Sequence, residues 1–125
     1  MREIEFRAWL KDEKKMVSVE EIHFRHQFIE YYDGNYDDCW LEKDLNDIEL
    51  MQYIGCKGKN GVKIFEDDIV KYRDNIYQVV WAKHSFCFAL KNKNGYISFG
   101  SPECRYIKVI GNTYENSELL NHLEP

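Results

Sequence analysis

The chain has 125 residues, and 17 Lys and Arg against 22 Asp and Glu give it a net charge of −5 at pH 7. This length suits one domain or a small barrel with an extension, and a hydrophobic content of 44% is enough for a core that needs no metal or disulfide. The 15% aromatic content argues against disorder, 7 Gly and 2 Pro argue against a collagen or a linker, and the negative charge argues against a uniformly basic nucleic-acid coat.

The first residues and the cysteines predict a cytoplasmic protein. No apolar run approaches membrane-spanning length, and the first five residues lack the apolar stretch of a secretory signal. The four cysteines lie far apart, without the Cys-x-x-Cys pair that zinc ribbons use. An even count allows two disulfides, but a reducing compartment favours free, mostly buried thiols. The cysteines are Cys39, Cys56, Cys87 and Cys104.

The first half of the chain predicts a β-hairpin followed by an acidic extension. Apolar and polar residues alternate over 4–9, and 16–19 supply the partner strand after a charged turn. The stretch 20–49 holds ten acidic and two basic residues with aromatics between them, and its pattern is weak. A helix over 20–32 is one interpretation, because three of its apolar residues would share a face.

The second half predicts a small barrel of short strands joined by tight turns. Asn60-Gly61 and Asn94-Gly95 both supply the positive φ angles of a tight hairpin turn. A short helix is predicted over 116–123. The predicted strands cover 49–54, 62–65, 68–72, 76–82, 85–90, 96–99 and 106–110. The fold class is therefore mainly β, with an N-terminal hairpin and acidic aromatic extension over 1–56 and a barrel with a C-terminal helix over 57–125.

Charge is unevenly distributed along the chain. Residues 1–50 carry 7 basic and 14 acidic side chains, whereas 51–125 carry 10 basic and 8 acidic ones. A solvated surface is the simplest interpretation. The asymmetry also fits self-association, with the acidic segment of one subunit on the barrel of the next, or a nucleic-acid site on the barrel. The candidates for self-association are Tyr31, Tyr32 and Trp40, as exposed aromatics that become buried between subunits. The candidates for nucleic-acid binding are Lys71, Arg73, Lys83, Lys91, Lys93 and Lys108.

Catalytic and metal-binding patterns have little support. His23 and His26 form a His-x-x-His pair for which Glu20 and Glu30 are candidate further ligands, but two partly exposed histidines are the better explanation of the pair. The His-Glu-x-x-His frame, the Gly-rich phosphate loop and the Gly-x-Ser-x-Gly elbow are all missing. We therefore predict no catalytic residue, no cofactor, no metal ligand and no enzymatic activity.

Three segments together resemble a known family. They are Phe6–Trp9 with Met16-Val17, then Met51–Gly55 with Lys59–Gly61 and Ile64–Val70, and finally Val109–Asn116 with Leu119-Leu120. On these segments the chain is similar, from end to end, to the YopX family of bacteriophage and prophage proteins. At one turn where the family favours Gly, this chain has Asp67, which tolerates a positive φ better than most side chains.

The resemblance implies an SH3-type barrel in the C-terminal half, a place in the bacterial host cytoplasm, and large homo-oligomers of about twelve chains. It implies no established activity and transfers no catalytic residue. We expect a non-enzymatic phage or prophage protein that acts as a self-associating interaction module, without a membrane partner. A nucleic-acid-binding barrel in phage replication or regulation is the alternative. A host-factor inhibitor, whose acidic aromatic segment mimics a polyanion, is a third hypothesis.

Overall fold

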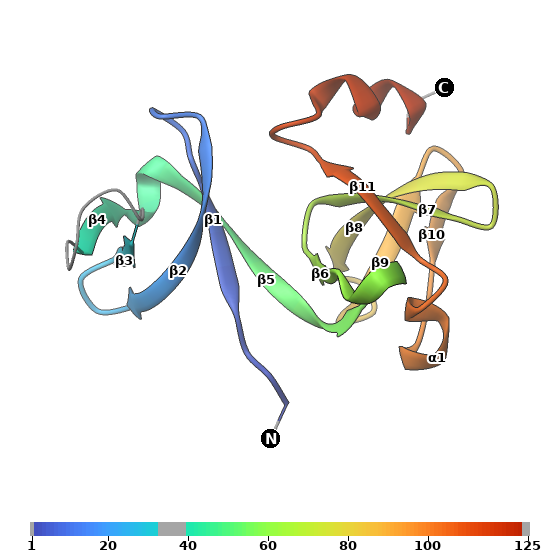
Figure 1. The fold of residues 1–125 in the computed structure, drawn as a ribbon, viewed down its shortest axis with the longest axis horizontal. Helices are drawn as coiled ribbons and strands as arrows, with labels where there is room; N and C mark the ends of the chain where they lie inside the picture. The colour runs from blue at the N-terminus through green and yellow to red at the C-terminus, as the bar shows by residue number, and fades with distance from the viewer. Residues whose placement is uncertain (1, 33–39, 124–125) are drawn as a thin grey trace. The chain divides into compact units, whose positions relative to one another are not determined.

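A computed structural model describes residues 2–32 and 40–123, and the protein is mainly β as expected (Figure 1). The strands are β1 (Phe6–Leu10), β2 (Lys15–His23), β3 (Phe28–Tyr32), β4 (Trp40–Asp44), β5 (Ile48–Lys57), β6 (Lys63–Phe65), β7 (Asp68–Tyr72), β8 (Asn75–Ala82), β9 (Cys87–Asn92), β10 (Gly95–Ile97) and β11 (Lys108–Asn112). The helical segments are the 3-10 turns η1 (Leu45–Asp47), η2 (Lys59–Gly61) and η3 (Ser117–His122) and the one-turn helix α1 (Ser101–Cys104). The chain divides into two compact units, Glu3–Gln52 and Tyr53–Pro125 with Met1–Arg2, which we call the N-terminal and C-terminal units.

The N-terminal unit contains β4, β3, β2, β1 and the first half of β5, which follow one another in a six-stranded antiparallel sheet of the order β4-β3-β2-β1-β5-β6. The predicted first hairpin is confirmed, since Trp9 pairs with Met16 across β1 and β2. On its other side β1 pairs with β5. One face of this sheet packs into an apolar core, whose buried members are Ala8, Leu10, Val17, Ile29, Tyr31 and Ile48.

The alternative of a helix over 20–32 is wrong, because this stretch forms the β2–β3 hairpin. Ile22 lies opposite Ile29, and the chain reverses through a four-residue turn in which Gln27 has a φ of 60°. Apolar side chains two residues apart, Ile29 and Tyr31, are both buried in the core. Core residues therefore recur every second position, as in a strand. The apolar spacing in the sequence that would also suit one face of a helix is a coincidence.

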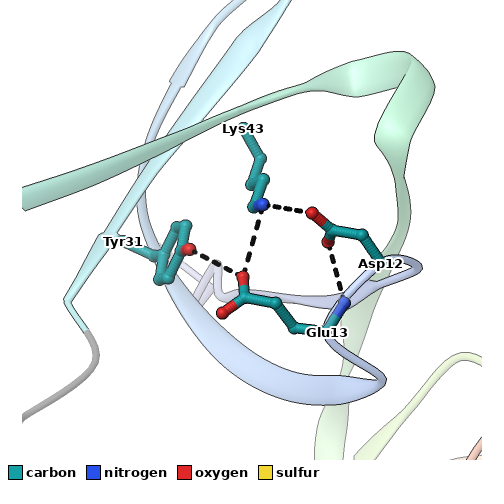
Figure 2. A network of polar contacts seen from close by, with 4 residues as sticks. All are labelled: Asp12, Glu13, Tyr31 and Lys43. Carbon is teal, nitrogen blue, oxygen red and sulfur yellow. Dashed lines mark hydrogen bonds and ion pairs between the residues drawn. The ribbon is translucent and has the colours of Figure 1, made fainter.

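Polar contacts tie the β1–β2 turn to β4 (Figure 2). The Lys43 Nζ lies 2.7 Å from the Asp12 Oδ2 and 3.3 Å from the Glu13 Oε2. The Tyr31 hydroxyl reaches the same Glu13 carboxylate at 3.5 Å. The hydrogen bond from Lys43 holds the pKa of Asp12 below its usual value, and the same bond raises the pKa of Lys43.

The C-terminal unit has a sheet in the order β10-β9-β8-β7-β11. Four strands follow one another as a meander, α1 comes next, and β11 returns to pair with β7. This is the connectivity of the SH3-type barrel that the family resemblance implies. The core of this unit contains Ile64, Val70, Tyr72, Tyr77, Val79, Leu90 and Ile107.

The Asn60-Gly61 turn is confirmed, and the second hairpin turn forms where it was predicted, but Asn94 does not adopt the positive φ expected of it. Asn60 and Gly61 have φ angles of 62° and 73°, and Gly95 has a φ of 115°. The strand predicted over 85–90 begins later, at Cys87. Phe86 lies instead in the preceding turn with a φ of 52° and is 79% exposed. A positive φ places a residue outside the strand conformation, and the alternating pattern around Phe86 gave no sign of it.

The prediction of free thiols is wrong for two of the cysteines. Cys56 at the end of β5 and Cys104 in α1 form a disulfide, with their Cα atoms 6.3 Å apart. Cys87 has a free, half-buried thiol and lines the same hollow of about 270 Å³ as the disulfide. Cys39 falls outside the described residues. The paired cysteines are 48 residues apart, so only the fold shows that they meet.

The acidic residues of the turn between β6 and β7 accept hydrogen bonds from the rest of the C-terminal unit. Asp68 is 1% exposed, and its Oδ2 accepts a hydrogen bond of 2.8 Å from the Phe65 backbone N–H. Asp67 adopts the positive φ expected of it, 66°. Its carboxylate accepts hydrogen bonds from the Gln78 amide at 3.0 Å and from the Tyr114 hydroxyl at 3.1 Å.

A second turn, after β11, meets the first one. The Thr113 N–H donates to the Asp67 carbonyl at 3.0 Å. The buried Asn112 side chain accepts from the backbone N–H groups of Tyr114 and Glu115 at 3.0 and 2.8 Å. The two turns come from two of the segments that carry the family resemblance, and their polar groups largely satisfy one another. These motif residues therefore have structural roles.

We expect Lys43→Met to lower stability slightly at neutral pH, because exposed ion pairs contribute little. Folding lowers the pKa of Asp12, so its contribution exists above its unfolded-state value near 4 and disappears as the pH falls through the folded value. Folding raises the pKa of Lys43, so its own contribution is lost only as the pH rises through that raised value. The gap in urea midpoint between wild type and K43M should therefore be present at pH 7 and close in strong acid.

Lys14→Met is the control for this experiment, because Lys14 is an exposed lysine in the same turn. It changes the net charge by the same amount without touching Asp12. If K14M and K43M followed the same pH profile, net charge rather than the Figure 2 contacts would account for the effect.

Asp68→Ala should reduce the free energy of unfolding by about 1–3 kcal/mol, because the buried Phe65 N–H loses an acceptor. Asp68→Asn keeps an oxygen at that position and should cost less. Urea denaturation of both variants measures the difference. An equal loss in the two would mean that the negative charge, and not the acceptor, matters.

Candidate interaction surfaces

The face of β2, β3 and β4 opposite the core carries acids and aromatics. Residues directly opposite each other in antiparallel strands project from the same face of the sheet. Glu21 lies opposite Glu30, and Glu30 lies opposite Glu42, so three carboxylates form one row. We call this surface the acidic-aromatic face; its members are Glu21, His23, Phe28, Glu30, Tyr32, Trp40, Glu42 and Asp44.

A β-bulge sets which glutamate joins this row. The pairing runs from Val19 opposite Tyr31 directly to Glu21 opposite Glu30, which leaves Glu20 as the extra residue. Without the bulge, Glu20 would lie opposite Glu30. Burial raises the pKa of Glu30, and the neighbouring Glu21 carboxylate raises it further.

The three aromatic candidates for self-association have different positions. Tyr31 is 2% exposed and belongs to the core, so its prediction as an exposed residue is wrong. Tyr32 and Trp40 are 38% and 55% exposed, and their rings lie edge to face with centroids 6.3 Å apart. Side chains of consecutive residues in a strand point to opposite faces of the sheet, so Tyr31 lies in the core and its neighbour Tyr32 on the surface.

The two histidines of the His-x-x-His pair lie in different elements. His23 ends β2 and stacks on Phe28, with ring centroids 4.1 Å apart and an interplanar angle of 10°. His26 lies in the exposed turn that follows. Of the other two acids considered with the pair, only Glu30 lies near His23. Glu21, which the sequence analysis did not single out, takes the place that Glu20 was expected to fill.

A basic cleft lies on the C-terminal unit. It has a volume of about 360 Å³, and Lys71 and Lys108 lie directly opposite each other across β7 and β11 within it. Lys59 is held beside them, because its backbone N–H donates to the Ile107 carbonyl at 2.9 Å. Like charges directly opposite each other destabilise a sheet, so this arrangement suits an anionic partner. The cleft is lined by Lys59, Lys71, Arg73, Asp74, Tyr106 and Lys108.

An exposed aromatic ring stands at the edge of the cleft. Tyr106 is 55% exposed, and the Arg105 guanidinium lies 4.9 Å from its ring centroid. Tyr106 and Arg73 also line an adjoining hollow with Tyr72, Pro102, Glu103 and Arg105. A stacking ring beside several cations is the arrangement that single-stranded nucleic acids require.

The structure divides the six nucleic-acid candidates. Lys71, Arg73 and Lys108 line the basic cleft. Lys91 instead lies over the Tyr96 ring at 5.5 Å. Lys83 and Lys93 are exposed in the turns that follow β8 and β9. Lys59 and Tyr106 were missed, because η2 and the turn after α1 are far apart in the sequence.

The fold and these surfaces define a β protein of two units, with an acidic-aromatic face on one and a basic cleft on the other. The chain belongs to the YopX family, whose model, described as YopX protein, matches residues 5–121. The family suggests a phage-type protein whose function is not established. In the described ranges, 2–32 and 40–123, no helix is long and apolar enough to cross a membrane.

A solved structure has the same fold. The crystal structure of protein EF1440 from Enterococcus faecalis is similar to this chain, with a TM-score of 0.70 and 25% sequence identity. The similarity covers 96% of this chain and 99% of that one. No curated protein matches the chain.

Proposed function

We propose that this is a non-enzymatic phage or prophage protein that works by self-association in the cytoplasm of the bacterial host. The acidic-aromatic face of one copy docks on the basic cleft of the next. The observation that carries this proposal is the presence of complementary charges on two different faces of one chain, with exposed Tyr32 and Trp40 beside the acids. Tyrosine and tryptophan are typical anchors of protein interfaces.

A contact between two different faces is heterologous. Each copy that joins still has one of its two faces free to bind a further copy. The contacts close into a ring when the rotation between successive subunits adds up to a full turn. This supports an assembly of many subunits, in keeping with the large oligomers that the family resemblance implies. The reducing host cytoplasm works against the Cys56–Cys104 bond, so there the C-terminal unit relies on its apolar core.

Light scattering after size exclusion tests the assembly. At about 50 mM salt the mass should be several times 15.1 kDa, and at about 500 mM it should fall, because salt screens exposed charges. Trp40→Ala should weaken association roughly tenfold or more, as loss of a buried interface anchor does. Trp81→Ala is the control, since Trp81 is also an exposed tryptophan but lies on the C-terminal unit. A monomer at both salt concentrations would rule out self-association.

Nucleic-acid binding is the second candidate function, and the basic cleft with Tyr106 at its edge favours it. The charge-reversal variant Lys71→Glu with Lys108→Glu should weaken binding to single-stranded DNA and lower the salt slope by about 2. Lys91→Glu with Lys93→Glu makes the same change in charge outside the cleft. Fluorescence anisotropy across a salt series measures both. Equal losses in the two pairs would indicate general charge attraction and no site in the cleft.

A further inference from the structure

Three metal-ligating groups converge near the β2–β3 turn. The His23 Nε2 lies 3.3 Å from a Glu21 carboxylate oxygen and 3.4 Å from a Glu30 carboxylate oxygen. One potential ligand atom from each residue lies within 4.8 Å of the other two. The bulge at Glu20 and the cross-strand pairing bring these groups together, so the arrangement depends on both strands.

The His23 imidazole is held in place, and its Nε2 faces the two carboxylates without a hydrogen bond among the described residues. Stacking on Phe28 fixes the plane of the His23 ring. In the described part of the chain, the Nε2 atom is buried and makes no hydrogen bond, although two carboxylates lie within ion-pair distance of it and the His23 side chain as a whole is 35% exposed. Buried polar atoms are nearly always paired in folded proteins, and an unpaired one is costly. A ligand between the three groups would satisfy it.

The distances from His23 to the two carboxylates match those between the ligands of a tetrahedral metal ion. Zinc binds imidazole nitrogen and carboxylate oxygen at about 2.0–2.2 Å, which separates tetrahedral ligands by about 3.4 Å. The distances from His23 to Glu21 and Glu30 already have this value. The row of opposed glutamates also gains from a cation, because Glu42 adds a third carboxylate next to Glu30.

We propose that Glu21, His23 and Glu30 bind a divalent transition-metal ion of the Zn²⁺ type, with water completing the coordination. One imidazole with two carboxylates suits Zn²⁺, whereas Ca²⁺ and Mg²⁺ prefer sites built entirely of oxygen. The ion joins β2 to β3 and replaces the repulsion between the two glutamates with bonds to a common centre. The three ligands belong to the acidic-aromatic face, so a bound ion would lower the negative charge that the proposed self-association uses, but they share no residue with the basic cleft.

Titration calorimetry of the full chain, freed of metal by EDTA, tests the site with Zn²⁺ and then with Mg²⁺. We expect one Zn²⁺ per chain, a higher thermal midpoint with Zn²⁺, and much weaker binding of Mg²⁺. His23→Gln and Glu30→Gln should each weaken Zn²⁺ binding at least tenfold, since even the loss of residues that only support ligands costs about 10–100-fold. Circular dichroism without metal verifies that both variants are folded.

Matched controls lie next to the proposed ligands. His26→Gln and Glu20→Gln make the same chemical changes in the adjacent turn and at the bulge, and both should bind Zn²⁺ like the wild type. Cys87 has a free thiol that could bind the metal instead. If the three proposed ligands bind it, the spectrum of the Co²⁺-loaded protein should lack a sulfur-to-metal charge-transfer band. Binding that persists in H23Q, or a sulfur band, would place the metal elsewhere and overturn the proposal. So would a wild type that binds no Zn²⁺, which would leave His23 as an ion-pair partner only.

Discussion

The C-terminal unit depends on the hydrogen bonds that join the turn before β7 to the turn after β11. Asp67 receives bonds from both Gln78 and Tyr114, and its carbonyl accepts from the Thr113 N–H. These bonds hold the last strand beside the first strand of the meander, which is the pairing that completes an SH3-type sheet. The polar residues of the two turns are thereby occupied within the fold. The candidate functional surfaces lie elsewhere, and of the family segments Lys59–Gly61 reaches one of them, because Lys59 lines the basic cleft.

The charge difference between the two halves of the sequence becomes a difference between two defined surfaces. Cross-strand register gathers the acids of β2, β3 and β4 on one face, and the return of β11 beside β7 places Lys108 opposite Lys71. Neither arrangement is favourable for an isolated sheet, since like charges are opposed in both. A cation bound at Glu21, His23 and Glu30 would reduce the negative charge of the acidic-aromatic face. Its attraction for a basic surface would fall accordingly.

Local signals in the sequence predicted much of the fold. The positions of the two Asn-Gly turns and of the first hairpin depend on residues a few positions apart, and they were predicted correctly. The β2–β3 hairpin was missed, because its register contains a bulge that no single-residue pattern reveals. The Cys56–Cys104 bond was missed because it depends on contacts between distant segments. The candidate surfaces also depend on strand pairing. The register of β3 decides that Tyr31 is buried and Tyr32 exposed, and only the pairing of β7 with β11 brings Lys71 and Lys108 together.

One strand belongs to both units. Residues 48–52 of β5 pair with β1, and the rest of the strand, through Lys57, pairs with β6. A gene fragment that ends at Gln52 or begins at Tyr53 would therefore cut through a continuous strand. Each half would retain only the part of β5 that its own partner strand pairs with, and would end abruptly at a newly exposed backbone. Expression of either half by itself calls for the whole of β5 in both pieces, so the useful fragments overlap by ten residues.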